Sequence, residues 1–250
     1  MTATVSLLPA AGTTRPAGAS LGTLTGIEIR KSLSTRSGKA VAVIAMLIGP
    51  VGVFIGSLGG DGEAPGAAIL GITGMLTALV LMALGVLSTA GEWTHKSVQV
   101  TYLLVPQRGR VLAAKVLALV GMGAVFAAVG AALTTAMLWA IPDPIGWTGI
   151  GRAFLVAVCA GAAMAVTGAG VGAALGNTPA ALTGMYLTIL GVMPVLAAFK
   201  PKIAEKLDPA SSIVNLAQGS STTTPILVLT GWVVISVALG ALISRRRAVQ

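Results

Sequence analysis

The sequence predicts an all-α membrane protein with six transmembrane helices. Three observations support this prediction: the composition, the lengths of the charge-free stretches, and the placement of lysine and arginine. Of the 250 residues, 55% are hydrophobic and 9% are charged, whereas a soluble domain carries about 25% charged residues. The mean hydropathy is +0.93. Such a surface cannot face water on all sides. The composition therefore excludes a soluble globular enzyme, a disordered chain and, with one cysteine, a disulfide-stabilised scaffold.

Six stretches are long enough to cross a bilayer, since a transmembrane helix needs about 20 apolar residues. The charge-free stretch between Arg152 and Lys200 is too long for one helix. The cluster Gly176-Asn177-Thr178-Pro179 divides it, because these residues favour a turn, and Pro194 is expected to kink the helix that follows. The expected spans are residues 40–60, 66–90, 111–140, 153–175, 179–199 and 225–244. They belong to one membrane domain, 20–250, which follows a flexible cytosolic tail at 1–19.

Lysine and arginine concentrate on one side of the predicted bundle. If the N-terminus lies inside the cell, twelve of the sixteen fall on the inner side, and Arg152, Lys200, Lys202 and Lys206 fall on the outer side. The positive-inside rule then predicts that both termini are cytosolic. In a nucleic-acid-binding protein the charges would gather on one folded face instead. We therefore expect lipid, and no nucleic acid, around this chain.

The chain lacks the motifs of most catalytic and metal-binding chemistry. Gly38-Lys39 is not part of a phosphate-binding loop, because Ala40 follows it and no glycine stands five residues before it. His95 is the only histidine, and Cys159 is interpreted as a packing residue. Apart from Lys115 at the base of the third span, no acidic or basic residue is expected inside the spans, which argues against an ion-coupled transporter. We expect no catalytic site, no metal ion and no cofactor on this chain.

The loop between the second and third spans carries the most informative pattern. Its apolar residues Trp93, Val100 and Leu104 recur at a spacing that favours an amphipathic helix at the membrane surface. Pro106 would end that helix. Basic residues then mark the base of the third span: Arg108, Arg110 and Lys115.

The order of residues in this loop resembles the first cytosolic loop of ABC-2 type permeases, which are the six-helix membrane subunits of bacterial ABC exporters. The matching residues are Glu92, Leu103, Leu104, Pro106, Arg108, Ala114 and Lys115. Lys96-Ser97 and Gln107 depart from the family's pattern. The segment from Glu28 to Ser37 is similar to the family's N-terminal segment, with an acidic residue, then Arg-Lys, then Thr-Arg. The resemblance covers residues 20–247.

The resemblance implies a role for each of these two segments. Residues 20–37 would form an amphipathic connecting helix on the inner membrane surface, with Glu28, Arg30, Lys31 and Arg36 as its marking residues. Residues 92–106 would form a cytosolic coupling helix that docks on a separate ABC ATPase subunit, its apolar ridge buried and its charges setting the register. The expected docking residues are Glu92, Trp93, Lys96, Val100, Leu104 and Arg108. ATP and Mg²⁺ would bind that partner, so this chain is not expected to be an enzyme.

The function that the resemblance implies is that of a permease subunit of an ATP-driven ABC exporter in the bacterial plasma membrane. Such a subunit pairs with a second copy or a sister permease and moves a hydrophobic or amphipathic substrate, such as an antibiotic, peptide or lipid, by alternating access. Two alternatives stay open. An ATPase-independent carrier or channel would transport alone, and a non-transporting scaffold would only hold a complex together. An intramembrane enzyme ranks last, because no catalytic constellation is present.

Small residues on the fourth span predict close helix packing. Gly168, Gly172 and Gly176 recur every four residues and form one small face. In lipid, helices associate through such faces because small residues let backbones approach. We interpret this face as packing within one subunit rather than as a seam between two.

Overall fold

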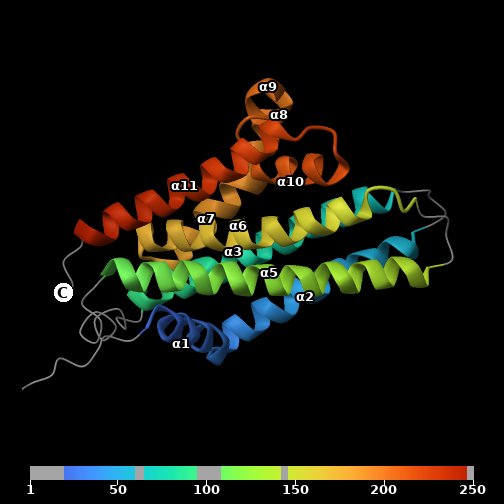
Figure 1. The fold of residues 1–250 in the computed structure, drawn as a ribbon. Coiled ribbons are helices and arrows are strands. Elements are labelled where there is room, and N and C mark those ends of the chain that lie inside the picture. The colour runs from blue at the N-terminus through green and yellow to red at the C-terminus, as the bar shows by residue number, and fades with distance from the viewer. Residues whose placement is uncertain (1–19, 60–64, 95–107, 142–145, 247–250) are drawn as a thin grey trace, which may run out of the picture.

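The computed structural model describes residues 20–59, 65–94, 108–141 and 146–246, which form a bundle of helices (Figure 1). The helices are α1 Leu21–Ser34, α2 Arg36–Ser57, α3 Gly66–Thr94, α5 Arg108–Ala140, α6 Ile150–Leu175, α7 Thr178–Tyr186, the π-helical turn η1 Leu187–Val192, α8 Met193–Phe199, α9 Pro201–Ala204, α10 Pro209–Gln218 and α11 Thr223–Arg246. The described residues contain no β-sheet, only an isolated bridge between Pro65 and Gly146. The all-α fold class is confirmed.

Six helical segments among the described residues are long and apolar enough to cross a membrane, which confirms the expected number. They are Arg36–Ser57, Gly66–Thr94, Gly109–Ala140, Ile150–Leu175, Thr178–Phe199 and Thr223–Ser244. Each begins and ends within four residues of the expected span. α1 and the C-terminal end of α11 lie at the same end of the bundle (Figure 1).

α3 and α6 form the centre of the bundle, and most of each apolar segment is buried. The two helices cross closely because glycines remove side chains from the contact. A Cβ added at Gly168 would collide with the carbonyl oxygen of Met82, and one added at Gly172 would collide with the hydroxyl of Thr89. The Thr89 hydroxyl also donates to the carbonyl oxygen of Ala169 at 3.0 Å. The small face of α6 therefore packs against α3 within this chain.

The turn between α6 and α7 follows directly from its sequence. Gly176 ends α6 in the left-handed conformation, with a φ of 60°, so it closes the helix instead of continuing the small face. The Asn177 side chain accepts a hydrogen bond from the backbone N–H of Ala180 at 3.0 Å and caps α7. Further along the same span, the π-helical turn η1 lies directly before Pro194. Proline and π-helical turns are both known causes of helix kinks.

Two short helices, α9 and α10, connect α8 to α11. The carboxylate of Asp208 caps α10 by accepting hydrogen bonds from Ala210 N at 2.9 Å and Ser211 N at 3.1 Å. At the other end, the guanidinium of Arg152 donates to the carbonyl oxygens of the last two residues of α10 at 3.2 and 2.8 Å. Ile213 is fully buried. α10 packs against α3, α6 and α11, and Arg152 ties its C-terminal end to α6.

Candidate functional site

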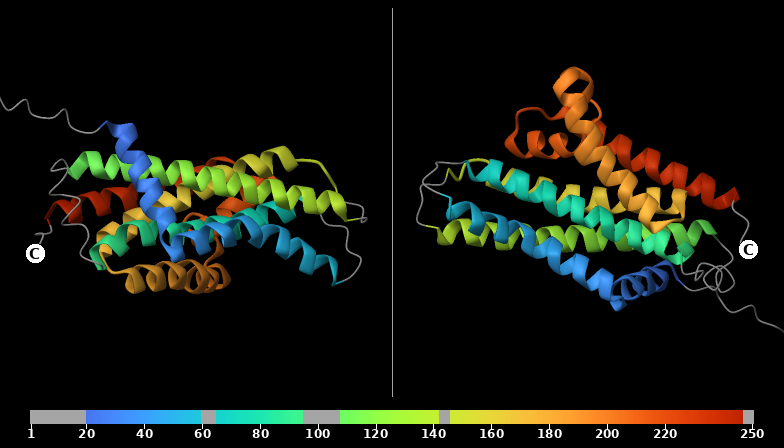
Figure 2. Two further views of the ribbon diagram at one scale, coloured as in Figure 1. Left: turned by 90° about the horizontal axis from the view of Figure 1, so that it is seen from below. Right: turned by 180° about the vertical axis from the view of Figure 1, so that it is seen from behind.

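α1 lies across the bundle near the end where α3 ends and α5 begins (Figure 2). Ser20 caps the helix, because its hydroxyl accepts from Thr23 N at 3.1 Å. Thr35 interrupts the helical chain with an extended backbone, and its hydroxyl accepts from Gly38 N at 3.0 Å to begin α2. α1 and α2 therefore meet at a capped corner. The buried side of α1 carries Leu24 and, unexpectedly for a surface helix, Glu28.

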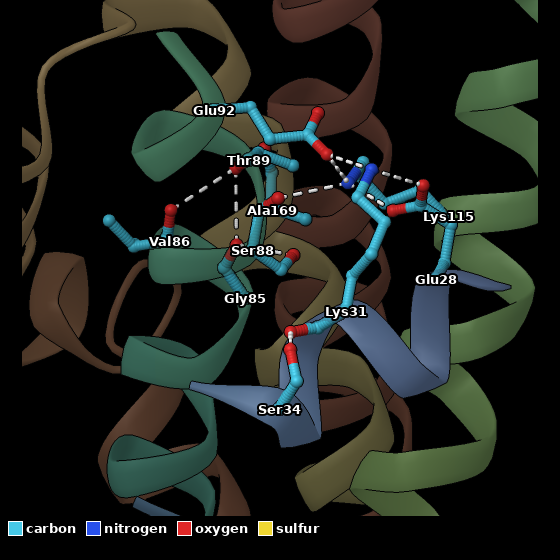
Figure 3. Close-up of polar contacts among 10 residues, drawn as sticks. All are labelled: Glu28, Lys31, Ser34, Gly85, Val86, Ser88, Thr89, Glu92, Lys115 and Ala169. Atoms are coloured by element: carbon cyan, nitrogen blue, oxygen red, sulfur yellow. Dashed lines mark hydrogen bonds and ion pairs between the residues drawn. The ribbon is translucent and has the colours of Figure 1, made fainter. Parts of the chain in front are cut away.

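Four charged side chains from three helices meet beneath α1, and we call them the charged cluster: Glu28 and Lys31 of α1, Glu92 of α3 and Lys115 of α5 (Figure 3). Lys31 is paired with Glu28 at 2.8 Å and also with Glu92. Lys115 is paired with Glu28 and lies 3.3 Å from Glu92. Its ammonium also donates to the carbonyl oxygen of Ser88 at 2.9 Å. Each lysine thus bridges the two carboxylates.

Burial makes this cluster electrostatically costly unless every charge is paired. Glu28 and Lys115 are each 6% exposed. Burial by itself raises the pKa of Glu28, but the charge and hydrogen bonds of Lys115, together with those of Lys31, outweigh it and lower that pKa. Burial lowers the pKa of Lys31, and its hydrogen bonds and ion pairs with Glu28 and Glu92 raise it to a greater extent. Each charged side chain of the cluster thus has a counter-charge beside it.

A cavity of about 410 Å³ lies beside the charged cluster. All four charged side chains line it, together with hydroxyl-bearing residues of the α1–α2 corner and of the neighbouring helix ends: Ser32, Ser34, Thr35, Ser37, Ser88, Thr94 and Thr178. The cavity is polar on the side of α1 and apolar at Leu84 and Leu87 of α3.

The described part of the chain holds no group of three or more His, Cys, Asp or Glu side chains that could bind a metal ion. Its two carboxylates in the charged cluster each already bind two ammoniums. None of these contacts joins a nucleophile to an adjacent base, which is the arrangement that covalent catalysis needs. The ion pairs of the cluster join α1, α3 and α5.

The structure brings together some of the residues that the sequence singled out. Glu28, Lys31 and Glu92 meet in the charged cluster, whereas Arg30 is exposed on α1 and Arg36 is the first residue of α2. Trp93 is half-buried near the end of α3. Of the other expected docking residues, Arg108 begins α5, and Lys96, Val100 and Leu104 lie outside the described residues.

Lys115 has a larger part in the site than the sequence reasoning assigned to it. That reasoning placed Lys115 at the base of the third span and expected no other charge inside any span. In the structure α5 begins at Arg108, so Lys115 lies two turns inside the helix and is buried. The available indication was its setting, because apolar residues flank it on both sides. A charge in such a setting requires a partner.

Comparisons with family models and with curated proteins gave no match. No protein-family model matches the sequence, and no curated protein is similar enough to count as a match. The function must therefore be argued from the residues and their arrangement alone.

Proposed function

We propose that this chain is the permease subunit of an ATP-driven ABC exporter in the bacterial plasma membrane, with both termini in the cytosol. The observation that carries the proposal is the charged cluster. It joins α1 to the end of α3 and the first turns of α5. α1 belongs to one of the two segments that resemble ABC-2 type permeases. The end of α3 and the start of α5 belong to the other, which lies far from it in the sequence. Their meeting at one end of the bundle is what a mechanical link to an ATPase requires.

The link would work through the ion pairs. Glu92 lies near the end of α3, directly before the segment 95–107 that would dock on the ATPase subunit. A displacement of that segment would act on Glu92, and the pairs with Lys31 and Lys115 would carry it to α1 and α5 together. Buried ion pairs resist separation because an unpaired charge in a buried site costs several kcal/mol. Repacking of the helices between two states would then expose a substrate path alternately to each side.

The substrate and the second membrane subunit belong to the same proposal. A hydrophobic or amphipathic substrate, such as an antibiotic, a peptide or a lipid, would move between two copies of this chain, or between it and a sister permease. The large exposed apolar side chains on α2, among them Phe54 and Ile55, leave room for such a neighbour. ATP and Mg²⁺ would bind only the cytosolic partner.

The decisive experiment is purification of the tagged chain from the membranes of its own cells. We expect a separate protein with a phosphate-binding loop to co-purify, and inside-out vesicles to accumulate a hydrophobic dye when ATP is added. The double substitution Glu92→Lys and Trp93→Ala should weaken the binding of the ATPase about tenfold. Arg30→Gln is the matched control, because Arg30 is an exposed charge of α1 outside the charged cluster.

Three other results would contradict the proposal or part of it. Transport by the purified chain alone in liposomes, without ATP, would identify a carrier or channel. Unchanged dye transport in cells that lack the chain, with loss of a larger membrane complex, would identify a scaffold. Full ATPase binding by the Glu92 and Trp93 variant would exclude the end of α3 as the coupling element.

A further inference from the structure

An apolar groove runs along α11, beside its contact with α6. It has a volume of about 640 Å³ and lies between α11, α8 and one residue of α6. Its walls include Val171 of α6, Met193 of α8, and Leu227, Trp232 and Leu239 of α11. Leu227 is 67% exposed and Leu239 is 49% exposed, so the groove is open along the helix. Pockets of this volume hold drug-sized and larger ligands.

The polar groups in the wall are mostly satisfied within the protein. The indole N–H of Trp232 donates to the carbonyl oxygen of Leu207 at 2.8 Å. The hydroxyl of Ser236 donates to the carbonyl oxygen of Val233 at 3.0 Å. The length of the groove therefore presents a surface that suits a hydrocarbon chain rather than water.

Two donors on the groove have no partner among the residues that the structure describes. Lys206 is the only charged side chain among the described residues that line it, and Thr224 lines it as well. Neither side chain forms a hydrogen bond or an ion pair within the described part of the chain. The acids nearest Lys206 in sequence are Glu205 and Asp208, and the Asp208 carboxylate is occupied by the N-terminal N–H groups of α10. The groove thus combines an apolar channel with a cation and a hydroxyl.

We propose that this groove binds an anionic phospholipid of the surrounding bilayer. An acyl chain would lie along Leu227, Trp232 and Leu239, and a phosphate oxygen would accept hydrogen bonds from the ammonium of Lys206 and the hydroxyl of Thr224. Lysine binds phosphate as a compact charge, and basic sites between membrane helices select lipid headgroups. A lipid with a net negative charge is favoured, since the groove supplies a cation and no carboxylate. This proposal does not depend on the exporter function.

A second copy of the chain is a less suitable occupant. A protein surface seated in the groove would bury the ammonium of Lys206, and a buried charge without a counter-charge is costly. A lipid phosphate brings that counter-charge with it. The distinction is testable, because a lipid and a second copy change the mass of the particle by very different amounts.

The test is native mass spectrometry of the full chain in detergent, after delipidation, titrated with dioleoylphosphatidylglycerol or dioleoylphosphatidylcholine. We expect the phosphatidylglycerol to bind about fivefold more tightly, which is the usual effect of one lysine near an anionic lipid. Lys206→Gln should remove this preference and Thr224→Val should reduce it. Lys202→Gln is the matched control, because Lys202 is an exposed lysine of α9 that does not line the groove.

A second pair of variants tests the apolar part of the groove. An added Cβ at Gly231, which lines the groove, meets no atom within 4 Å, and the same holds at Gly184 of α7, which does not line it. Gly231→Trp should therefore fill the groove and weaken both lipids, whereas Gly184→Trp should weaken neither. Equal binding of the two lipids to the wild type, or an unchanged preference in Lys206→Gln, would overturn the proposal. So would a wild-type dimer that Gly231→Trp converts to a monomer.

Discussion

Glu28 and Lys115 lie 87 positions apart in the sequence, and their side chains form a buried ion pair that joins α1 to α5. Each residue is 6% exposed. Because an unpaired charge is strongly disfavoured at such a site, the pair specifies how α1 lies on the bundle. The same two side chains contact Lys31 and Glu92, so the pair also determines the charge balance of the whole cluster.

Replacing Glu28 with glutamine should loosen α1. The substitution leaves Lys115 with Glu92 at 3.3 Å as its remaining counter-charge, and removal of one partner of a buried pair costs about 3 kcal/mol. Hydrogen exchange in residues 21–34 should become faster by a corresponding amount, while exchange in α3 and α6 stays slow. Glu205→Gln is the control, because Glu205 is an exposed acid outside the charged cluster. Equal exchange rates in the two variants would contradict a role of Glu28 in holding α1 on the bundle.

The double substitution Glu28→Leu and Lys115→Met should be milder than either single one. Replacing both members of a buried pair with apolar residues of similar size is often neutral, because no charge is left without a partner. We expect the double variant to lie within about 1 kcal/mol of the wild type in the same exchange measurement. If the loss of stability in the double variant equals the sum of the losses in the two single variants, the two residues act independently.

The docking of α1 should depend on pH in the acid range. The pKa of Glu28 is lowered from its ordinary value of 4.5, so its ionised form stabilises the folded protein above that value, and this stability is lost as the pH falls through the lowered pKa. The pKa of Lys31 is raised from 10.5, so its contribution is present below 10.5 and is lost as the pH rises through the raised pKa. A spin label at Arg30→Cys, with Cys159→Ala, should become mobile below about pH 4.5. The Glu28→Gln variant should show no such acid transition.

The corner between α1 and α2 should require glycine at position 38. A Cβ added there would collide with the carbonyl oxygen of Ser32 and lie 2.9 Å from the Thr35 hydroxyl. Gly38→Ala should therefore cost about 1 to 3 kcal/mol, as overpacking does. Gly26→Ala on α1 meets nothing within 4 Å and should gain up to about 1 kcal/mol from helix propensity. The temperature at which the purified protein loses its monodisperse peak measures both, and similar values would contradict the close contact.

The crossing of α3 and α6 offers a second matched pair. Gly168→Ala should lower that temperature, because the added Cβ collides with the Met82 carbonyl oxygen and the cost is about 1 to 3 kcal/mol. Gly121→Ala on α5 has open space around its Cβ and should be neutral or stabilising. If the two variants lose stability equally, glycine at 168 serves some purpose other than close packing.

Much of the helix layout could be predicted from the sequence because its causes are local. About 20 apolar residues are needed to cross a bilayer, and breaks in hydropathy are visible in the chain, as at Asn177 and Pro179. The charged cluster could not be predicted in the same way. Its residues were noticed only as parts of two separate segments. No periodicity connects Lys31 to Glu92 or Glu28 to Lys115, because these pairs lie 61 and 87 positions apart.

By itself, the sequence determined that this chain forms six apolar helices, where they begin and end to within four residues, and which residues break them, because those properties depend on neighbours along the chain. Only the tertiary structure decided that Lys115 is buried, that α1 crosses α5 with Glu28 beneath it, and that a groove with Lys206 runs along α11. These features depend on which helix faces meet. Packing between distant residues selects those faces, through glycine contacts such as Gly168 on Met82 and through the need to pair every buried charge.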